Sequence, residues 1–203
     1  FFENSKNCKN EEVRAKYEGV EYFFRAMFYY QMVQKYGDMP WYGAVIASDD
    51  NAGMNKPRES RGYVMMKVLE DCDKAWELLP EKWSTDPRFH VSKDAAMALK
   101  SRAALFEGTF RKYHAGDAFV PKDEETYGDV TVSSEWFLRQ AADAASKVMG
   151  KKSMYKGNTL HLAAKDTDAS YREYFILDDA EATETILARR YNAEILVRYG
   201  VQF

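Results

Sequence analysis

Residues 29 to 43 read YYQMVQKYGDMPWYG, and in this stretch a long helix gives way to a long loop. Apolar residues before it recur every three or four positions, which predicts an amphipathic helix over residues 11–36. Gly37 is typical of a helix C-terminus, and Pro40 prevents the helix from resuming. Two large aromatic rings follow at once, close to solvent. The stretch therefore predicts a helix end followed by two aromatic side chains at the start of a loop.

Two apolar faces run along this first helix. The first consists of Val13, Tyr17, Val20, Phe24, Met27 and Gln31, and the second of Phe23, Tyr30 and Val33. Two faces on one helix predict packing on two sides.

Three further helices follow from the same periodicity, over residues 60–79, 92–113 and 134–148. Small residues, mostly alanine, accompany the apolar stripes and allow helices to approach closely. Four helices of this length predict a mainly α fold of tetratricopeptide-like antiparallel helix pairs, with long loops and little β structure. In this arrangement we expect Leu99 and Phe106 to be buried.

The remaining segments lack a helical period. Residues 43–59 are rich in Gly, Asn and Asp and predict a long loop. Residues 114–133 predict another loop, in which Lys122-Asp-Glu-Glu is a solvated charge run. Near the end, residues 171–177 predict one or two helical turns, and Thr185–Tyr191 is a candidate strand.

Composition narrows the functional class. The chain has 203 residues, of which 46% are hydrophobic and 30% charged, as expected of a folded domain. A net charge of -3 without a basic stripe argues against a nucleic-acid partner. No apolar run approaches the roughly 20 residues that cross a bilayer. Cys8 and Cys72 could pair in an oxidising compartment, but Cys72 lies on an apolar helix stripe, which favours a buried thiol.

A search for catalytic and metal-binding motifs gives little. The three histidines lie far apart, and no zinc-binding spacing accompanies them. Asp49-Asp50-Asn51 with Gly53 resembles the start of a calcium loop, but the spacer and the closing Glu are absent. No nucleophile elbow, phosphate-binding loop or distinctive carboxylate pair occurs. We therefore expect no metal, no cofactor and no enzymatic activity, and the aromatic surplus favours binding.

Five segments in order resemble the SusD/RagB family of nutrient-uptake lipoproteins of Bacteroidetes outer membranes. The chain begins FFENSKN, like the segment that enters the first of the family's helices. The family's hallmark, F-R-A, an aromatic helix and G-D-x-P, resembles Phe24-Arg25-Ala26 through Tyr36-Gly37-Asp38-Met39-Pro40. The segments PRESRGYVMMKVLEDCDKAWELLP, VSKDAAMALKSRAALFEGTF and TILARRYN are similar to the later ones. Thr185 departs from the pattern, because the family usually has Glu there.

The resemblance implies a lipid-anchored protein at the cell surface, in the outer membrane, that captures an oligosaccharide or another nutrient. It also implies a partner, a TonB-dependent SusC-like barrel that the protein covers as a lid. Residues 1–203 would form a single helical-repeat domain, incomplete at both ends. The lipid anchor would lie outside this stretch, because Ser5-Lys6-Asn7 before Cys8 is no lipobox. Alternative functions are a tetratricopeptide-type protein-interaction scaffold without sugar binding, or a glycosidase.

Trp41 and Tyr42 are the leading candidates for ligand contact. A sugar has an apolar C–H face that an indole can stack on, and Asp49, Asp50 and Asn51 could supply hydrogen bonds to its hydroxyls. Two other interpretations stay open for Trp41. It could close the end of the first helix pair, or contact the barrel or another part of the protein.

Overall fold

The computed structural model describes residues 5–152, 174 and 184–189. Four long helices dominate it: α2 (Glu11–Tyr36), α4 (Arg61–Leu78), α5 (Lys93–His114) and α6 (Ser134–Val148). The shorter elements are α3 (Asn51–Met54), a 3-10 turn (Pro87–Phe89), β1 (Glu125–Tyr127) and β2 (Val130–Val132). The four predicted helices are confirmed, each within one residue at either end.

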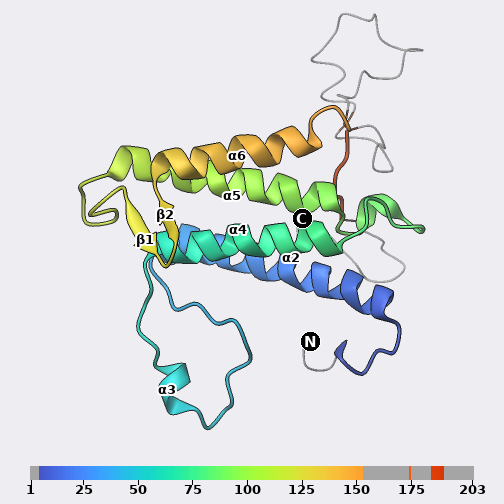
Figure 1. The fold of residues 1–203 in the computed structure, drawn as a ribbon, viewed down its shortest axis with the longest axis horizontal. Helices are drawn as coiled ribbons and strands as arrows, with labels where there is room; N and C mark the ends of the chain where they lie inside the picture. Colours follow the sequence, from blue (N-terminus) through green and yellow to red (C-terminus); the bar gives the residue numbers. More distant parts are fainter. Residues whose placement is uncertain (1–4, 153–173, 175–183, 190–203) are drawn as a thin grey trace, which may run out of the picture.

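The helices form two layers of antiparallel pairs (Figure 1). Helix α2 packs on α4, α5 packs on α6, and α4 contacts α5 between the layers. Each chain reversal places consecutive long helices side by side, as the tetratricopeptide-like prediction requires. Within the described residues, no helix is both long and apolar enough to cross a membrane.

Side chains at the helix N-termini define where each helix begins. Asn10, Ser60, Ser92 and Ser133 each accept a hydrogen bond from a backbone N–H three residues further on. These bonds satisfy N–H groups that have no partner inside the helix. At the other end of α2, Gly37 adopts a φ of 69°, which glycine tolerates best, and its N–H donates to the carbonyl of Val33.

The buried face of α2 is the second of the two predicted faces, not the first. Phe23 and Val33 are 3% and 1% exposed, whereas Tyr17 and Phe24 are each 49% exposed. Of the two faces predicted to pack, only the second is thus largely buried within the described residues. Both stripes have apolar residues at helical spacing, so periodicity alone could not choose between them. Within the described chain, the contacts of α2 are made mainly with α4, and these fix its orientation.

Leu99 connects two hydrophobic clusters but is itself only partly buried. Phe106 is also partly buried, against the larger cluster, which includes Val64, Met65 and Phe137. The prediction that both side chains are buried is thus wrong in degree. The fully buried apolar positions of α5 include small residues, such as Ala96, and the larger Met97, where α5 packs between α4 and α6.

The segment after α5 differs from the predicted solvated loop. Strands β1 and β2 form an antiparallel hairpin that pairs Glu125 with Val132 and Tyr127 with Val130. Gly128 begins its two-residue turn with a φ of 60°, a conformation that favours glycine. Val132 is buried, so the hairpin belongs to the core. Period-2 alternation over three residues is too short a signal to separate from a loop.

Two members of the predicted charge run have structural partners. Asp123 accepts hydrogen bonds from the backbone and the hydroxyl of Ser134 at the start of α6, at 2.9 and 2.8 Å. Glu125 forms an ion pair with Arg111. Lys122 and Glu124 are exposed. The run alternates between bound and solvated residues, so its description as a solvated loop was wrong for half of it.

A buried ionic network joins α4, α5 and the hairpin. Arg61 donates to both carboxylate oxygens of Glu107, with the shortest contact 2.8 Å, and Arg111 donates to the same carboxylate at 3.0 Å. Glu107 is 0% and Arg111 1% exposed. The second carboxylate, Glu125, binds Arg111 from the hairpin. Two cations and two anions thus balance in a buried site, as the cost of desolvation requires.

The C-terminal predictions are tested only in part. Residues 184–189 contain no strand, so the strand predicted over Thr185–Tyr191 is absent there, and the remainder lies outside the described residues. Instead, Ala188 makes a single backbone hydrogen bond to Arg88. The helical turns predicted over 171–177 lie outside the described residues except for Tyr174. Cys8 and Cys72 have free thiols, and Cys72 is buried as expected.

We expect Glu107→Ala to lower the free energy of unfolding by about 3–5 kcal/mol, because it leaves two buried guanidinium groups without their shared carboxylate. The matched control is Glu135→Ala, which removes an i,i+4 Glu–Arg pair of the same spacing whose side chains are 72% and 74% exposed. We expect it to cost about 0.5 kcal/mol or less. Urea unfolding followed by circular dichroism measures both. Equal effects of the two substitutions would contradict a role for burial.

Candidate functional site

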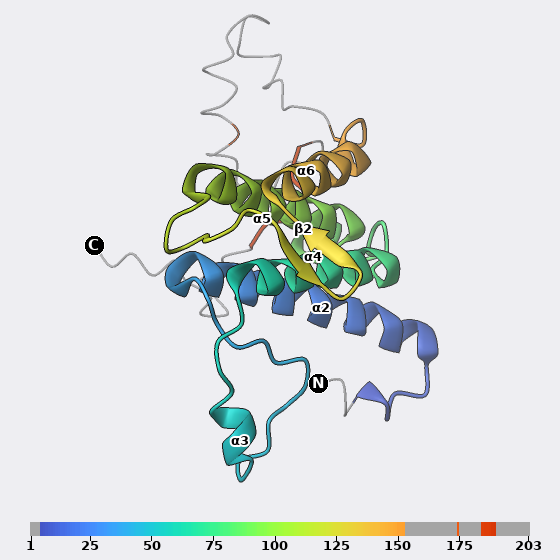
Figure 2. The ribbon, with the colours of Figure 1, turned by 60° about the vertical axis from the view of Figure 1, so that its left-hand side comes forward.

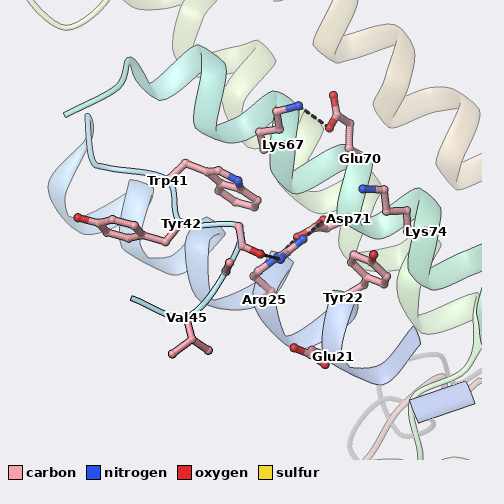
Figure 3. Close-up of a pocket in the computed structure, with 12 residues that line it drawn as sticks. Glu21, Tyr22, Arg25, Trp41, Tyr42, Val45, Lys67, Glu70, Asp71 and Lys74 are labelled. Carbon is pink, nitrogen blue, oxygen red and sulfur yellow. Dashed lines mark hydrogen bonds and ion pairs between the residues drawn. The ribbon is translucent and has the colours of Figure 1, made fainter. Parts of the chain in front are cut away.

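A pocket of about 590 Å³ lies between α2, α4 and the loop that follows Pro40. Figure 3 shows its walls, which come from three segments. Helix α2 contributes Glu21, Tyr22 and Arg25; the loop contributes Trp41 to Val45; and α4 contributes Lys67, Glu70, Asp71 and Lys74. On each helix these residues recur after three or four positions, with the adjacent pairs 21–22 and 70–71 widening the same face.

Arg25 lies at the centre of this pocket (Figure 3). Its Nε and Nη2 donate to the two carboxylate oxygens of Asp71 at 2.6 and 2.7 Å. Its Nη1 donates to the backbone carbonyl of Gly43 at 3.1 Å. A planar guanidinium matches a carboxylate in this two-bond fork and still has a donor for a third group. Arg25 therefore connects α2, α4 and the loop.

Burial acts on the charges of this pair. The Asp71 side chain is 2% exposed, and burial raises the pKa of its carboxyl group, while the hydrogen bonds and charge of Arg25 oppose that shift. The hydrogen bond to Asp71 raises the pKa of Arg25. The short two-bond fork is the geometry of a charged pair, so we assign Asp71 as ionised at neutral pH.

Aromatic rings surround the guanidinium. The Cζ atom of Arg25 lies 5.3 Å from the centre of the Tyr22 ring and 5.2 Å from that of Trp41. Trp41 also packs on Tyr29, with ring centres 4.2 Å apart, and it contacts the main hydrophobic cluster. Part of the indole therefore belongs to the packing at the end of α2, while the ring also lines the pocket.

Other charged side chains also line the pocket. Lys67 contacts Glu70 at 2.8 Å on the surface of α4. Lys74 places its ammonium 5.2 Å from the centre of the Tyr22 ring. The pocket thus combines ring faces with carboxylate and ammonium groups, a mixture that suits a ligand with both apolar faces and hydroxyls.

The structure separates the predicted ligand residues into two groups. Trp41 and Tyr42 line the pocket. Asp49 and Asn51 lie further along the loop, are exposed and are not among the lining residues. Asp50 accepts a hydrogen bond from Gly53 at 2.8 Å and so caps α3. In Figures 1 and 2 this part of the loop projects away from the helical layers, and a ligand role for Asp49 or Asn51 stays a prediction.

Sequence reasoning missed the helix walls of the pocket. Arg25 lies among aromatic residues on α2, and Asp71 lies on the buried side of α4. A charge within an apolar helix face is a signal for a buried partner, because an unpaired buried charge is costly. The sequence contained that signal on both helices, but not which helix faces which. Among the described residues, no group of three or more His, Cys, Asp or Glu could hold a metal ion.

Comparison with known proteins identifies the family. A SusD-like family model, described as "Starch-binding associating with outer membrane", matches residues 3–105, just over half of the sequence. The chain belongs to the SusD-like family. The matched region includes the pocket between α2, α4 and the loop. No curated protein matches this SusD-like sequence.

Solved structures agree on the fold. A SusD-like protein from Bacteroides fragilis matches with a TM-score of 0.65 and 23% identity, over 90% of this chain and 28% of that one. A laminarin-binding SusD-like protein matches with a TM-score of 0.53 and 17% identity, over 73% and 26% of the two chains. NanU from B. fragilis gives 0.51 and 19%, over 82% and 29%. The chain therefore spans less than a third of the length of these structures.

We expect Trp41→Ala to destabilise the protein, because the substitution removes the ring packed on Tyr29. A fully buried tryptophan costs about 3–5 kcal/mol on truncation, and Trp41 is only partly buried, so about 2 kcal/mol is expected. Thermal unfolding of Trp41→Ala and of Tyr113→Ala, whose ring is 80% exposed and lies outside the pocket, gives the comparison. A melting temperature unchanged by Trp41→Ala would show that the contact with Tyr29 contributes nothing.

Proposed function

We propose that this chain is part of a cell-surface glycan-binding protein, not an enzyme, and that the pocket containing Trp41 binds an oligosaccharide. The observation that carries the proposal is the composition of the pocket on a SusD-like fold. Rings of Tyr22 and Trp41 stand beside carboxylate and ammonium groups from α2 and α4. Sugars combine an apolar face with a polar rim, so rings and charged groups in one pocket complement them.

Size and relatives support the same proposal. A pocket of about 590 Å³ lies within the range of roughly 300–1,000 Å³ that small-ligand sites occupy, which suits a short segment of a glycan. The family is described as starch-binding, and one solved relative as laminarin-binding. Both descriptions concern glucose polymers. A glucan is therefore the first ligand class to test on this protein.

We expect the full-length protein to bind at least one oligosaccharide from a panel that includes malto-oligosaccharides and laminarin fragments. Trp41→Ala is expected to weaken binding at least tenfold, whereas Tyr113→Ala should leave it unchanged, since Tyr113 lies outside the pocket. Titration calorimetry measures the affinities, and each variant is compared below its melting temperature. Unchanged affinity in a destabilised Trp41→Ala would assign the ring to packing alone. No binding by the wild type to any glycan would overturn the proposed function.

We further propose that the protein delivers its ligand to a TonB-dependent SusC-like barrel in the outer membrane. The supporting observation is the loop between Pro40 and Ser60, which projects from the helical layers in Figure 2. Its tip consists mostly of polar residues. Exposed loops on a rigid scaffold are common sites of protein contact. Binding through polar loops is the mode that we expect.

A scaffold function without sugar binding is favoured by one observation, the exposed stripe of α2. Val13, Tyr17, Phe24 and Phe28 lie on one face of that helix and are 40–53% exposed. Exposed apolar stripes of this length often mark a surface that another polypeptide segment covers. The stripe and the polar loop therefore predict different partner surfaces.

Co-purification from the outer membrane at native expression separates these surfaces. We expect a barrel to co-purify with the full-length protein, to be lost with Asp49→Lys at the exposed loop, and to be retained with Phe24→Ser on the α2 stripe. The opposite pattern would favour a scaffold that binds through its apolar stripe. Absence of any barrel with the wild-type protein would overturn the delivery proposal.

A further inference from the structure

The wall of the pocket formed by residues 41–45 is a loop, and a loop gains a defined shape only from contacts with rigid elements. These residues belong to the longer loop between α2 and α4, whose two ends meet where Met39 and Glu59 exchange backbone hydrogen bonds, each of 3.1 Å. The part of this loop that leads back to α4 also binds the backbone of Trp41. Glu59 accepts from its N–H at 2.8 Å, and Lys56 donates to its carbonyl at 3.0 Å. Trp41 is thus anchored within the loop itself.

The next two residues are anchored from α2 instead. The hydroxyl of Tyr29 accepts a hydrogen bond from the N–H of Tyr42 at 2.8 Å. Four residues earlier, Arg25 donates to the carbonyl of Gly43 at 3.1 Å. Residues four apart lie on the same helix face, one turn along the axis. Successive turns of α2 therefore hold neighbouring backbone groups of the loop.

The guanidinium of Arg25 is already committed to protein groups. Nε and both terminal nitrogens each donate to Asp71 or Gly43, and only 19% of the Arg25 side chain is exposed. A ligand that used this charge directly would compete with a two-bond carboxylate fork, which is among the strongest arrangements available to arginine. The geometry favours an indirect role for Arg25.

We infer that Arg25 and Tyr29 are positioning residues that hold the loop wall, residues 41–45, against α2. The effect of Arg25 on a ligand is then exerted through the placement of Trp41 and Tyr42, not through its charge. The second half of this inference rests on the proposed glycan binding; the first half does not. Tyr29 provides the decisive variant, because it contacts the wall but is not among the residues that line the pocket.

Hydrogen exchange of the full-length protein, followed by mass spectrometry on peptides that cover residues 41–45, tests the structural half. We expect about tenfold faster exchange in Tyr29→Phe and in Arg25→Lys, since each removes a hydrogen bond to the wall. Tyr29→Phe retains the ring that packs on Trp41, so it is expected to fold normally even if Arg25→Lys leaves Asp71 poorly paired. The control is Arg14→Lys, on the same helix, where Arg14 forms an ion pair with Glu18 at 3.6 Å. Unchanged exchange in Tyr29→Phe and Arg25→Lys would overturn the inference.

Affinity for the glycan bound by the wild type tests the second half. We expect Tyr29→Phe to weaken binding about three- to tenfold, although the lost hydroxyl does not line the pocket. Full affinity in Tyr29→Phe together with faster exchange would overturn the effect on the ligand. If the wild type binds no glycan, the proposed function fails, and the exchange experiment still decides whether these residues hold the wall.

Discussion

The carboxylate of Glu107 is the constraint on which the rest of the structure depends. It is fully buried and shared by Arg61 of α4 and Arg111 of α5. The two helices can therefore meet in only one register without leaving a buried charge unpaired. Gly62 reflects the same constraint, since a Cβ there would lie 1.9 Å from Nη2 of Arg111. A buried network of this kind contributes little net stability compared with apolar packing, but every misaligned arrangement is penalised. Its value to the fold is specificity.

The N-terminus of α4 accounts for one residue in the connection after α2. Asp38 follows the glycine that ends α2 and accepts a hydrogen bond from the N–H of Arg61 at 2.9 Å. A carboxylate is favoured at that position, because the first N–H groups of a helix lack partners and the helix dipole is positive there. A residue just after the end of α2 is thus bonded to the first residue of α4. Residues 39–60, between these two positions, form a loop whose ends are held together. The length of this loop adds little to the free-energy cost of folding, because loop-closure entropy grows slowly with length.

Helix positions could be predicted from the sequence because caps and periodicity are local. Ser60, Ser92 and Ser133 each stand directly before the first residue of a helix and cap it, so the residue type that starts the helix lies next to it in the sequence. What could not be predicted depends on contacts between distant residues. The sequence gives α2 two usable apolar faces, and only packing on α4 selects the one that contains Phe23. Likewise, Trp41 was identifiable from its place after a helix end, whereas Arg25 and Asp71 are separated by 46 positions and meet only in the folded chain.

Packing and ligand contact are compatible roles for Trp41, because they use different parts of one ring. Contact with Tyr29 and backbone bonds to Glu59 and Lys56 fix the indole before any ligand arrives. Binding to a side chain that is already ordered avoids the entropy cost of immobilising it, which is about 0.5–1.5 kcal/mol for a flexible residue. A tryptophan side chain that moved freely in solvent would expose more ring surface to a ligand. Binding would then have to immobilise that side chain, and the entropy cost would weaken the affinity. The contact that makes Trp41 part of the fold is therefore also what would make it an efficient surface for a sugar.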